Sequence, residues 1–344
     1  MSTLDPLSRE TALSVLGSYA GLADDLTAFT PLPTGLYNRN ARLTAGGRDL
    51  VLKMLPAGRP ADASLYAVTL QARLAEAEFP CPGVLPNTAE HLITPCGGAD
   101  WTLQDWAEGR HLAAPDRPAH LDGGGARHLG GTLGSLHRQA GDLAGTGHLA
   151  GTVRTADLAR ILAATVDSAR AFLGGGLRPG PALKLRLKPG KSDLEQEICR
   201  WTPQLKTAAR VLADWRPPAD LDTPGPGHGD INWENLLFAE DGRVTVLDFD
   251  NAGLMPTAYD AGAACAVICG ANPTWQAAFA DGYDDAGGAT FPRENLPWLM
   301  VLKYTRSLAW QIRGRHEAAD RDLARSWVAF LGENLAATLS GLKP

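Results

Sequence analysis

The first hundred residues alternate short apolar runs with turn residues, a pattern typical of half-buried strands. The segment 43–55, LTAGGRDLVLKML, has two such runs around Gly46 and Gly47. It predicts a β-hairpin whose second strand ends near Lys53. The alanine-rich run 62–77 predicts a helix after this hairpin, and the prolines of FPCP close it because proline disfavours helix at its own position and the one before.

Two further apolar runs follow this helix. Residues 89–96 and 99–112 contain the β-branched and aromatic side chains of paired strands, and Gly97 and Gly98 lie between them as a turn. Residues 7–20 predict a short helix at the start. The first part of the chain is therefore expected to be a strand-rich α+β unit.

From Leu129 onward the apolar spacing becomes helical. The glycine-rich gaps 123–125 and 174–176 indicate loops. Because the change of pattern follows Gln104 to Gly109, we expect one lobe at 1–106 and a second, mainly helical lobe at 107–344. The helical segments predicted in the second lobe are 129–139, 155–173, 193–213 and 297–311.

Composition adds little beyond the class of protein. Hydrophobic residues make up 44% and charged residues 20% of 344 residues, which is ordinary for a globular protein. The net charge of −6 argues against a nucleic-acid partner, which favours a basic face. Without a signal-peptide pattern or a long apolar run, we expect a cytoplasmic chain with no membrane partner. Monomer and homodimer both stay open.

The cysteines fit neither a disulfide framework nor a zinc site. They are odd in number and contain no CxxC pair. We expect buried thiols at all five positions, Cys81, Cys96, Cys199, Cys265 and Cys269.

The segments 227–238 (GHGDINWENLLF) and 244–253 (VTVLDFDNAG) carry the candidate chemistry. Asp230 and Asn235 precede one short apolar strand, and Asp248 and Asp250 follow the next. A hairpin across Asp241-Gly242 would bring these oxygen side chains to one edge. Amide and carboxylate oxygens suit Mg²⁺ beside nucleotide phosphates. A further carboxylate, separate from the metal, is needed to accept a hydroxyl proton.

HGDxxxxN followed by a DFD strand resembles the aminoglycoside phosphotransferase and choline kinase-like superfamily. That resemblance implies a two-lobed protein-kinase-like α+β fold, with a small β-rich N-lobe and a larger helical C-lobe. It implies ATP and Mg²⁺ as cofactors and a small-molecule hydroxyl as acceptor, such as an amino alcohol, a sugar or an aminoglycoside. By resemblance, Asp230 is the catalytic base, Asn235 and Asp248 hold Mg²⁺, and Asp250 assists the metal or orients the loop.

The likeness covers most of residues 27–265. The segment 33–54 is similar to the family's nucleotide loop and ATP-binding lysine strand, which gives Gly35, Asn38 and Lys53 nucleotide-binding roles. The segment 103–112 looks like the hinge, which adds Gln104 and Trp106 to the nucleotide-binding residues. LGSLHRQ resembles a recurring helix of the family, and Asp260 of YDAG matches a conserved family position.

One feature departs from the family pattern. Kinases pair the strand lysine with a glutamate on the following helix, but 63–75 contains no acid. Three alternatives stay open: Asp62 or Glu76 at the helix ends takes this role, the ion pair is dispensable, or this lobe binds nucleotide poorly. A kinase-like protein that binds nucleotide or a partner without phosphate transfer is therefore the alternative.

Other candidate residues have structural explanations beside functional ones. His228 is expected to brace its loop, and Asp260 either caps the following helix or takes its family role. PGKS at 189–192 lacks the glycine spacing of a phosphate loop and is rejected. Five side chains could contact substrate, although core packing is the expected role of the aromatic ones: Trp233, Glu234, Tyr259, Tyr304 and Trp310.

Overall fold

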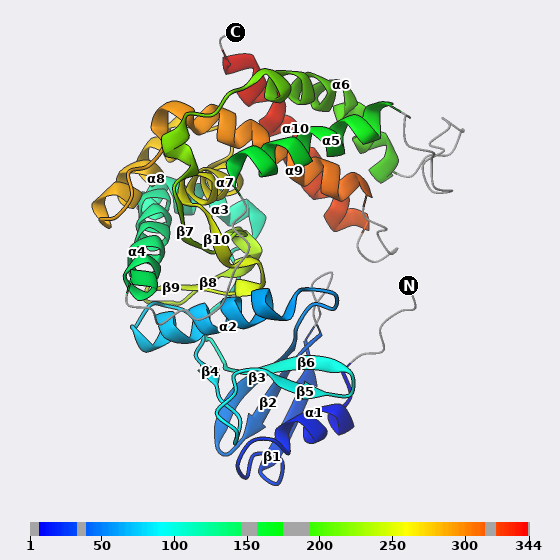
Figure 1. Ribbon diagram of the computed structural model, residues 1–344, viewed down its shortest axis with the longest axis vertical. Coiled ribbons are helices and arrows are strands. Elements are labelled where there is room, and N and C mark those ends of the chain that lie inside the picture. The colour runs from blue at the N-terminus through cyan, green and yellow to red at the C-terminus, as the bar shows by residue number, and fades with distance from the viewer. Residues whose placement is uncertain (1–6, 33–38, 146–156, 175–192, 314–320, 343–344) are drawn as a thin grey trace. The chain divides into compact units, whose positions relative to one another are not determined.

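The computed structural model describes residues 7–32, 39–145, 157–174, 193–313 and 321–342 (Figure 1). PGKS, Gly35 and Asn38 lie outside these residues. The chain forms two compact units that are not continuous in sequence. The first contains 1–118, 135–155 and 225–254; the second contains 119–134, 156–224 and 255–344. The lobe boundary expected at 106/107 stays a prediction.

The first unit is built on an antiparallel sheet. The order along the sheet is β1-β2-β3-β6-β4, and β5 pairs with β6. Both predicted hairpin turns are confirmed, and their glycines have the positive φ that such turns require. The strands are β1 (Leu26–Pro31), β2 (Asn40–Ala45), β3 (Arg48–Met54), β4 (Val84–Leu85), β5 (Thr94–Cys96) and β6 (Ala99–Asp105).

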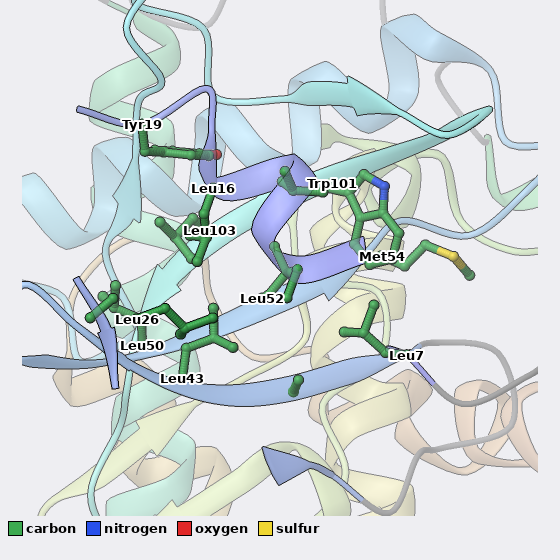
Figure 2. Close-up of a cluster of buried hydrophobic side chains, with 14 residues drawn as sticks. Leu7, Leu16, Tyr19, Leu26, Leu43, Leu50, Leu52, Met54, Trp101 and Leu103 are labelled. Atoms are coloured by element: carbon green, nitrogen blue, oxygen red, sulfur yellow. The ribbon is translucent and has the colours of Figure 1, made fainter. Parts of the chain in front are cut away.

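The two faces of this sheet have different chemistry. Leu50, Leu52 and Leu103 point into an apolar cluster that the helix α1 (Arg9–Leu16) completes, as Figure 2 shows. Because side chains alternate along a strand, Lys53 lies on the opposite face. Its cross-strand neighbours are Asn40 on β2 and Thr102 on β6, so this second face is polar around the lysine.

The two helices of this region begin and end for local reasons. The hydroxyl of Ser8 accepts the N–H of Thr11 and caps α1, which ends at Leu16, short of the predicted 7–20. α2 (Ala61–Glu76) starts directly after Pro60 and ends before the proline-containing segment at 79–82, close to the predicted 62–77. The segment 89–96 is strand only over its last three residues, so that prediction was too long.

Residues 224–256 contain the hairpin that was predicted to bring the candidate catalytic residues together. β8 pairs antiparallel with β9, with Leu236 opposite Val246, which confirms the hairpin across Asp241-Gly242. β7 pairs with β10. The elements are β7 (Pro224–Gly227), η4 (Trp233–Asn235), β8 (Leu236–Phe238), β9 (Val244–Val246), η5 (Phe249–Asn251) and β10 (Gly253–Pro256).

The second unit is mainly helical. α9 packs against α5, α6, α7 and α10, and α7 is buried from Tyr259 to Cys269. Gly123 and Gly124 have non-helical backbone angles just before α4, which fits the break predicted at 123–125. The remaining helices of the chain are α3 (Arg117–His120), η2 (Leu121–Gly125), α4 (Ala126–Gly145), α5 (Leu158–Gly174), α6 (Asp193–Asp214), α7 (Thr257–Cys269), α8 (Pro273–Asp285), α9 (Leu296–Arg313) and α10 (Arg321–Gly341), with short 3-10 turns η1 (Ala114–Asp116), η3 (Ala219–Asp222) and η6 (Arg293–Asn295). Of these, η1, the start of α3 and the part of α4 from Ser135 onward belong to the first unit.

The burial predictions were wrong at Trp310 and at three of the five cysteines, since only Cys265 and Cys269 are buried and Cys81 and Cys96 are half-buried. Cys199 is exposed, because it lies on the face of α6 opposite the buried Leu194, Ile198 and Trp201. Trp310 on α9 is also exposed, although its spacing suggested core packing. Within the described residues, no helix has the length and apolar character needed to cross a membrane.

Candidate active site

Lys53 and two aspartates form the centre of the candidate site. The Lys53 ammonium lies 2.7 Å from a carboxylate oxygen of Asp248 and 2.8 Å from one of Asp250. The lysine side chain is only 7% exposed, against 36% for Asp248 and 12% for Asp250. Because a buried charge needs close partners, these two carboxylates are what allow the lysine to stay inside.

The charges reinforce one another. Burial alone would lower the pKa of Lys53, but the negative charges of Asp250 and Asp248 outweigh burial and raise it. Burial likewise favours the neutral form of Asp248, yet the charge and hydrogen bond of Lys53, helped by His228, hold the pKa of Asp248 below its usual range. Lys53 and Asp248 therefore each favour the charged form of the other.

Asp248 has an unusual backbone conformation. Its φ of 60° and ψ of 67° lie in the left-handed region, which residues other than glycine and asparagine rarely adopt. Such a conformation costs about 1–3 kcal/mol and persists only where surrounding contacts fix it. Here the ion pair with Lys53 and the following turn η5 aim the carboxylate back toward β3.

The loop that carries Asp230 is braced by His228. The buried His228 ring donates through Nε2 to the carbonyl of Leu247 at 2.9 Å, and its Nδ1 accepts the N–H of Asp230 at 3.3 Å. The ring also meets Phe249 edge to face, at 4.7 Å between ring centres. His228 thus connects the loop to the segment of Asp248, in the bracing role predicted for it.

Asn235 makes a second connection between the same two segments. The side-chain amide of Asn235 donates to the backbone carbonyl of Asp230 at 2.8 Å. The backbone carbonyl of Asn235 accepts the N–H of Leu247 at 2.9 Å. The side chain of Asn232 also donates to the Asp230 carbonyl, at 3.1 Å. Both the N–H and the carbonyl of Asp230 are therefore hydrogen-bonded, which fixes the backbone position from which its side chain extends.

The donor set suits a cation that prefers oxygen ligands. Asn235 uses its amide nitrogen toward Asp230, which leaves the amide oxygen as the ligating end. The carboxylates of Asp248 and Asp250 already converge on one cation, the Lys53 ammonium. In the described part of the chain no three His, Cys, Asp or Glu side chains are grouped as a metal site, so phosphate or water oxygens would have to complete the coordination of Mg²⁺.

Neither acid at the ends of α2 pairs with Lys53, so the structure does not support that one of the three alternatives. Asp62 accepts the N–H of Ala63 in the first turn, and Glu76 pairs with Arg73 at the surface. The partners of Lys53 instead come from the segment after β9. The missing helix acid is therefore replaced by carboxylates nearly two hundred residues further along the chain.

α2 is attached to the same segment by other bonds. Arg59, just before the helix, donates to the carbonyl of Ala252 at 3.2 Å. Beyond the helix, the carbonyl of Pro80 accepts the N–H of Val246 at 2.8 Å. α2 also packs against η5. The helix is thus fixed relative to Asp248 and Asp250 without a lysine–glutamate pair.

The residues expected to bind nucleotide in the hinge have defined neighbours. The buried amide of Gln104 donates to Thr102 and accepts from Gln71 of α2, at 3.1 and 3.2 Å. Trp106 carries the guanidinium of Arg42 over its ring, 4.1 Å from the ring centre. Its indole N–H is buried, and no atom of the described residues accepts it. Gln104 therefore orients α2, and Trp106 offers an unsatisfied donor.

The side chains considered for substrate contact have mixed positions. Tyr304 is wholly buried and donates to the carbonyl of Ala266 at 2.7 Å, as expected of a core residue. Trp233 is also buried, and Glu234 pairs with Arg117 at 3.2 Å. Asp260 lies buried in the first turn of α7 rather than at its cap, which is Pro256. The capping explanation of Asp260 is therefore wrong.

Two residues of the site were missed from the sequence. Gln71, buried on α2, bridges Gln104 and the carbonyl of Pro82. An amide among the alanines and leucines of an otherwise apolar helix face was the available signal. Arg59 gave no signal, because an arginine between a glycine and a proline before a helix is usually a solvated loop residue.

The chain matches known proteins both by sequence model and by structure. The model of the Phosphotransferase enzyme family matches residues 28–296. A spectinomycin phosphotransferase in complex with ADP and spectinomycin is similar, with a TM-score of 0.67, 14% identity, and coverage of 97% of this chain and 99% of that one. No curated protein matches significantly.

Two further solved structures agree with this result. A microcompartment-associated aminopropanol kinase gives a TM-score of 0.64 at 18% identity over 97% of this chain and 98% of the other. An aminoglycoside phosphotransferase from Alicyclobacillus acidocaldarius gives 0.64 at 15% identity over 98% and 96%. At such low identity these likenesses show the fold.

Proposed function

Because the chain belongs to the phosphotransferase enzyme family and is a kinase, we propose that it transfers the γ-phosphate of ATP to a hydroxyl group of a small molecule. The family and the two-lobed kinase-like fold expected from the sequence are confirmed. The observation that carries the proposal is the convergence of Lys53, Asp248 and Asp250 beside the braced loop of Asp230.

The proposed roles follow from the chemistry of each group. Asp230 would orient the acceptor hydroxyl and take its proton, since its carboxylate rises from a backbone held on both sides. Asn235 and Asp248 would hold Mg²⁺, with Asp250 assisting, and Lys53 would bind nucleotide phosphate. When bound, Mg²⁺ supplies positive charge to the phosphates.

The proposed acceptor is a small amino-bearing alcohol, sugar or aminoglycoside-like compound. The net charge of −6 is compatible with a cationic acceptor. Aminopropanol kinase, spectinomycin phosphotransferase and an aminoglycoside phosphotransferase, named for their substrates, support this class. The alternative of a non-catalytic kinase-like protein is disfavoured by family membership and by the presence of the base, amide and aspartates together.

The first experiment measures phosphate transfer from ATP with Mg²⁺ to a panel of amino alcohols, sugars and aminoglycosides. For an acceptor that is turned over, we expect Asp230→Asn to lower kcat by about 10²–10⁴-fold, because a general base contributes on that order. The thermal midpoint should change little, since the N–H and carbonyl of Asp230, which make the bonds to His228, Asn232 and Asn235, are kept in the asparagine variant.

Asp241→Asn is the matched control. Asp241 lies in the turn between β8 and β9 and pairs only locally with Arg243 among the described residues. Its substitution should leave kcat within about twofold of the unaltered enzyme. Full turnover by Asp230→Asn would exclude Asp230 as the base.

A further inference from the structure

Lys53 has limited capacity to bind phosphate in this arrangement. An ammonium has three N–H donors, and Asp248 and Asp250 engage two of them at 2.7 and 2.8 Å. The lysine also balances only one of the two negative charges next to it. If nucleotide phosphates enter, another cation is needed to neutralise them.

Arg59 is a half-buried cation next to the same two carboxylates. Burial lowers its pKa, and the nearby charges of Asp250 and Asp248 oppose that change, so the guanidinium lies within their field while remaining charged. Within the described residues it makes no ion pair, although the charges of Asp250 and Asp248 act on it, and both of these carboxylates pair with Lys53. Its positive charge is thus not committed to one partner.

Most donors of this guanidinium are unused. Arginine has five N–H donors, and the side chain of Arg59 makes one hydrogen bond among the described residues, from Nη2 to the carbonyl of Ala252 at 3.2 Å. Its Nε–H is buried and finds no acceptor in the part of the chain that the structure describes. Leaving a buried donor unsatisfied is unfavourable, which points to a ligand that binds there.

The backbone around Arg59 restricts where the side chain can go. Gly58 before it has a φ of 80°, and Pro60 after it has a fixed φ and is the N-cap residue of α2. The bond to Ala252 then anchors the guanidinium beside η5, the turn that follows Asp248. A guanidinium held in this way is ready to form the paired hydrogen bonds that phosphate oxygens accept.

We propose that Arg59 is a second phosphate-binding residue of the nucleotide site, which contacts the terminal phosphates of ATP alongside Lys53. The proposal rests on the proposed kinase function. It also fits the absence of acids from 63–75, since the segment just before α2 would contribute a cation to the phosphates where other kinases contribute an acid to the lysine.

The test is nucleotide binding without turnover. Calorimetric titration with ATP, ADP and AMP, each with Mg²⁺ and no acceptor, compares the unaltered chain with Arg59→Gln. We expect ATP binding to weaken about 10- to 100-fold, ADP binding to weaken less, and AMP binding to stay within about twofold. Arg59→Lys should recover part of the ATP affinity, because lysine keeps the positive charge but lacks the paired N–H donors of the guanidinium.

Arg73→Gln is the matched control, since Arg73 lies on α2 but pairs with Glu76 at the surface. It should bind ATP as the unaltered chain does. Equal loss for ATP and AMP in Arg59→Gln, with a lower thermal midpoint in the absence of nucleotide, would show that Arg59 only anchors the segment of Ala252 and would overturn the proposal. So would unchanged ATP binding. If the unaltered chain binds no ATP, the proposed function itself fails.

Discussion

Lys53 is a buried charge whose stability depends on ionisation elsewhere. Its side chain is almost fully enclosed, and its two partners differ in exposure, with Asp248 nearer to solvent than Asp250. The pKa of Asp248 is lowered in the folded chain because the attraction of Lys53 exceeds the effect of burial. A carboxyl group with a lowered folded pKa stabilises the fold above its unfolded pKa of about 3.9 and loses that contribution as pH falls through the folded value.

Asp248→Asn should therefore change the pH dependence of stability. Asparagine keeps the shape and tolerates the left-handed backbone, so the substitution removes mainly the charge. At pH 7 we expect a loss of about 1–3 kcal/mol, less than the loss of a sole buried partner because Asp250 still holds the lysine. Urea unfolding between pH 7 and pH 3 should show the two proteins converging as the pH falls below about 4. A difference that stays constant over this range would argue against the ion pair.

At this scale the sequence predicted residue types better than residue partners. The resemblance indicated Lys53, Asp230, Asn235, Asp248 and Asp250, and the structure brings Lys53 to Asp248 and Asp250 directly. The lysine's partners could not be derived from spacing, because the family pattern places the partner acid on the next helix and 63–75 contains none. A contact between residues 195 positions apart depends on the packing of the whole unit.

The close approach of α4 and α8 is an element-scale feature. A Cβ at Gly130 would collide with the carbonyl oxygen of Phe279, and one at Gly282 with that of Arg127. The backbones of the two helices thus touch where side chains are absent. Gly141, on the same helix α4, has no atom within 4 Å of an added Cβ. One helix therefore contains both a glycine needed for packing and one that is not.

Gly130→Ala and Gly141→Ala should have opposite effects on stability. The first should destabilise by about 1–3 kcal/mol, because the helices must separate to admit a methyl group. The second should stabilise by up to about 1 kcal/mol, because alanine favours helix over glycine. Chemical denaturation of both variants measures this. Equal effects of the two substitutions would contradict the close approach of the helices.

The elements themselves were predictable where side-chain spacing dominates. The long helix predicted at 193–213 is observed at Asp193–Asp214, since its apolar stripe is strong. The strand predicted at 89–96 is reduced to Thr94–Cys96, because the side chain of Asn87 accepts the N–H groups of Ala89 and His91 and forms a turn there. Local polar side chains thus limit a strand that hydrophobicity alone would extend.

The cysteines report on packing across the whole molecule. Cys199 is exposed, Cys81 and Cys96 are half-buried, and Cys265 and Cys269 are buried in α7. Burial raises the pKa of Cys81 to about 12 and also raises that of Cys265. Because the thiolate is the reactive form, these thiols should react slowly in the native state.

Native labelling with a chromogenic disulfide reagent at pH 8 should therefore be uneven. Cys199 should react first, and Cys265 and Cys269 should react at least about 100-fold more slowly, until denaturant exposes all five thiols. Cys199→Ser should remove the fast phase. A fast phase that survives this substitution and maps to α7 would contradict the packing of the helical unit.

The long separation of Lys53 from its partners has a consequence for synthesis. At about 5–20 residues per second, a ribosome needs roughly 10–40 s to extend the chain from Lys53 to Asp248. During that interval the first hairpin has its cation but not the carboxylates that neutralise it, so enclosing the lysine is unfavourable. We therefore expect the nascent sheet to stay open around β3 until the later segment emerges. In that interval the exposed strand is a segment to which chaperones could bind.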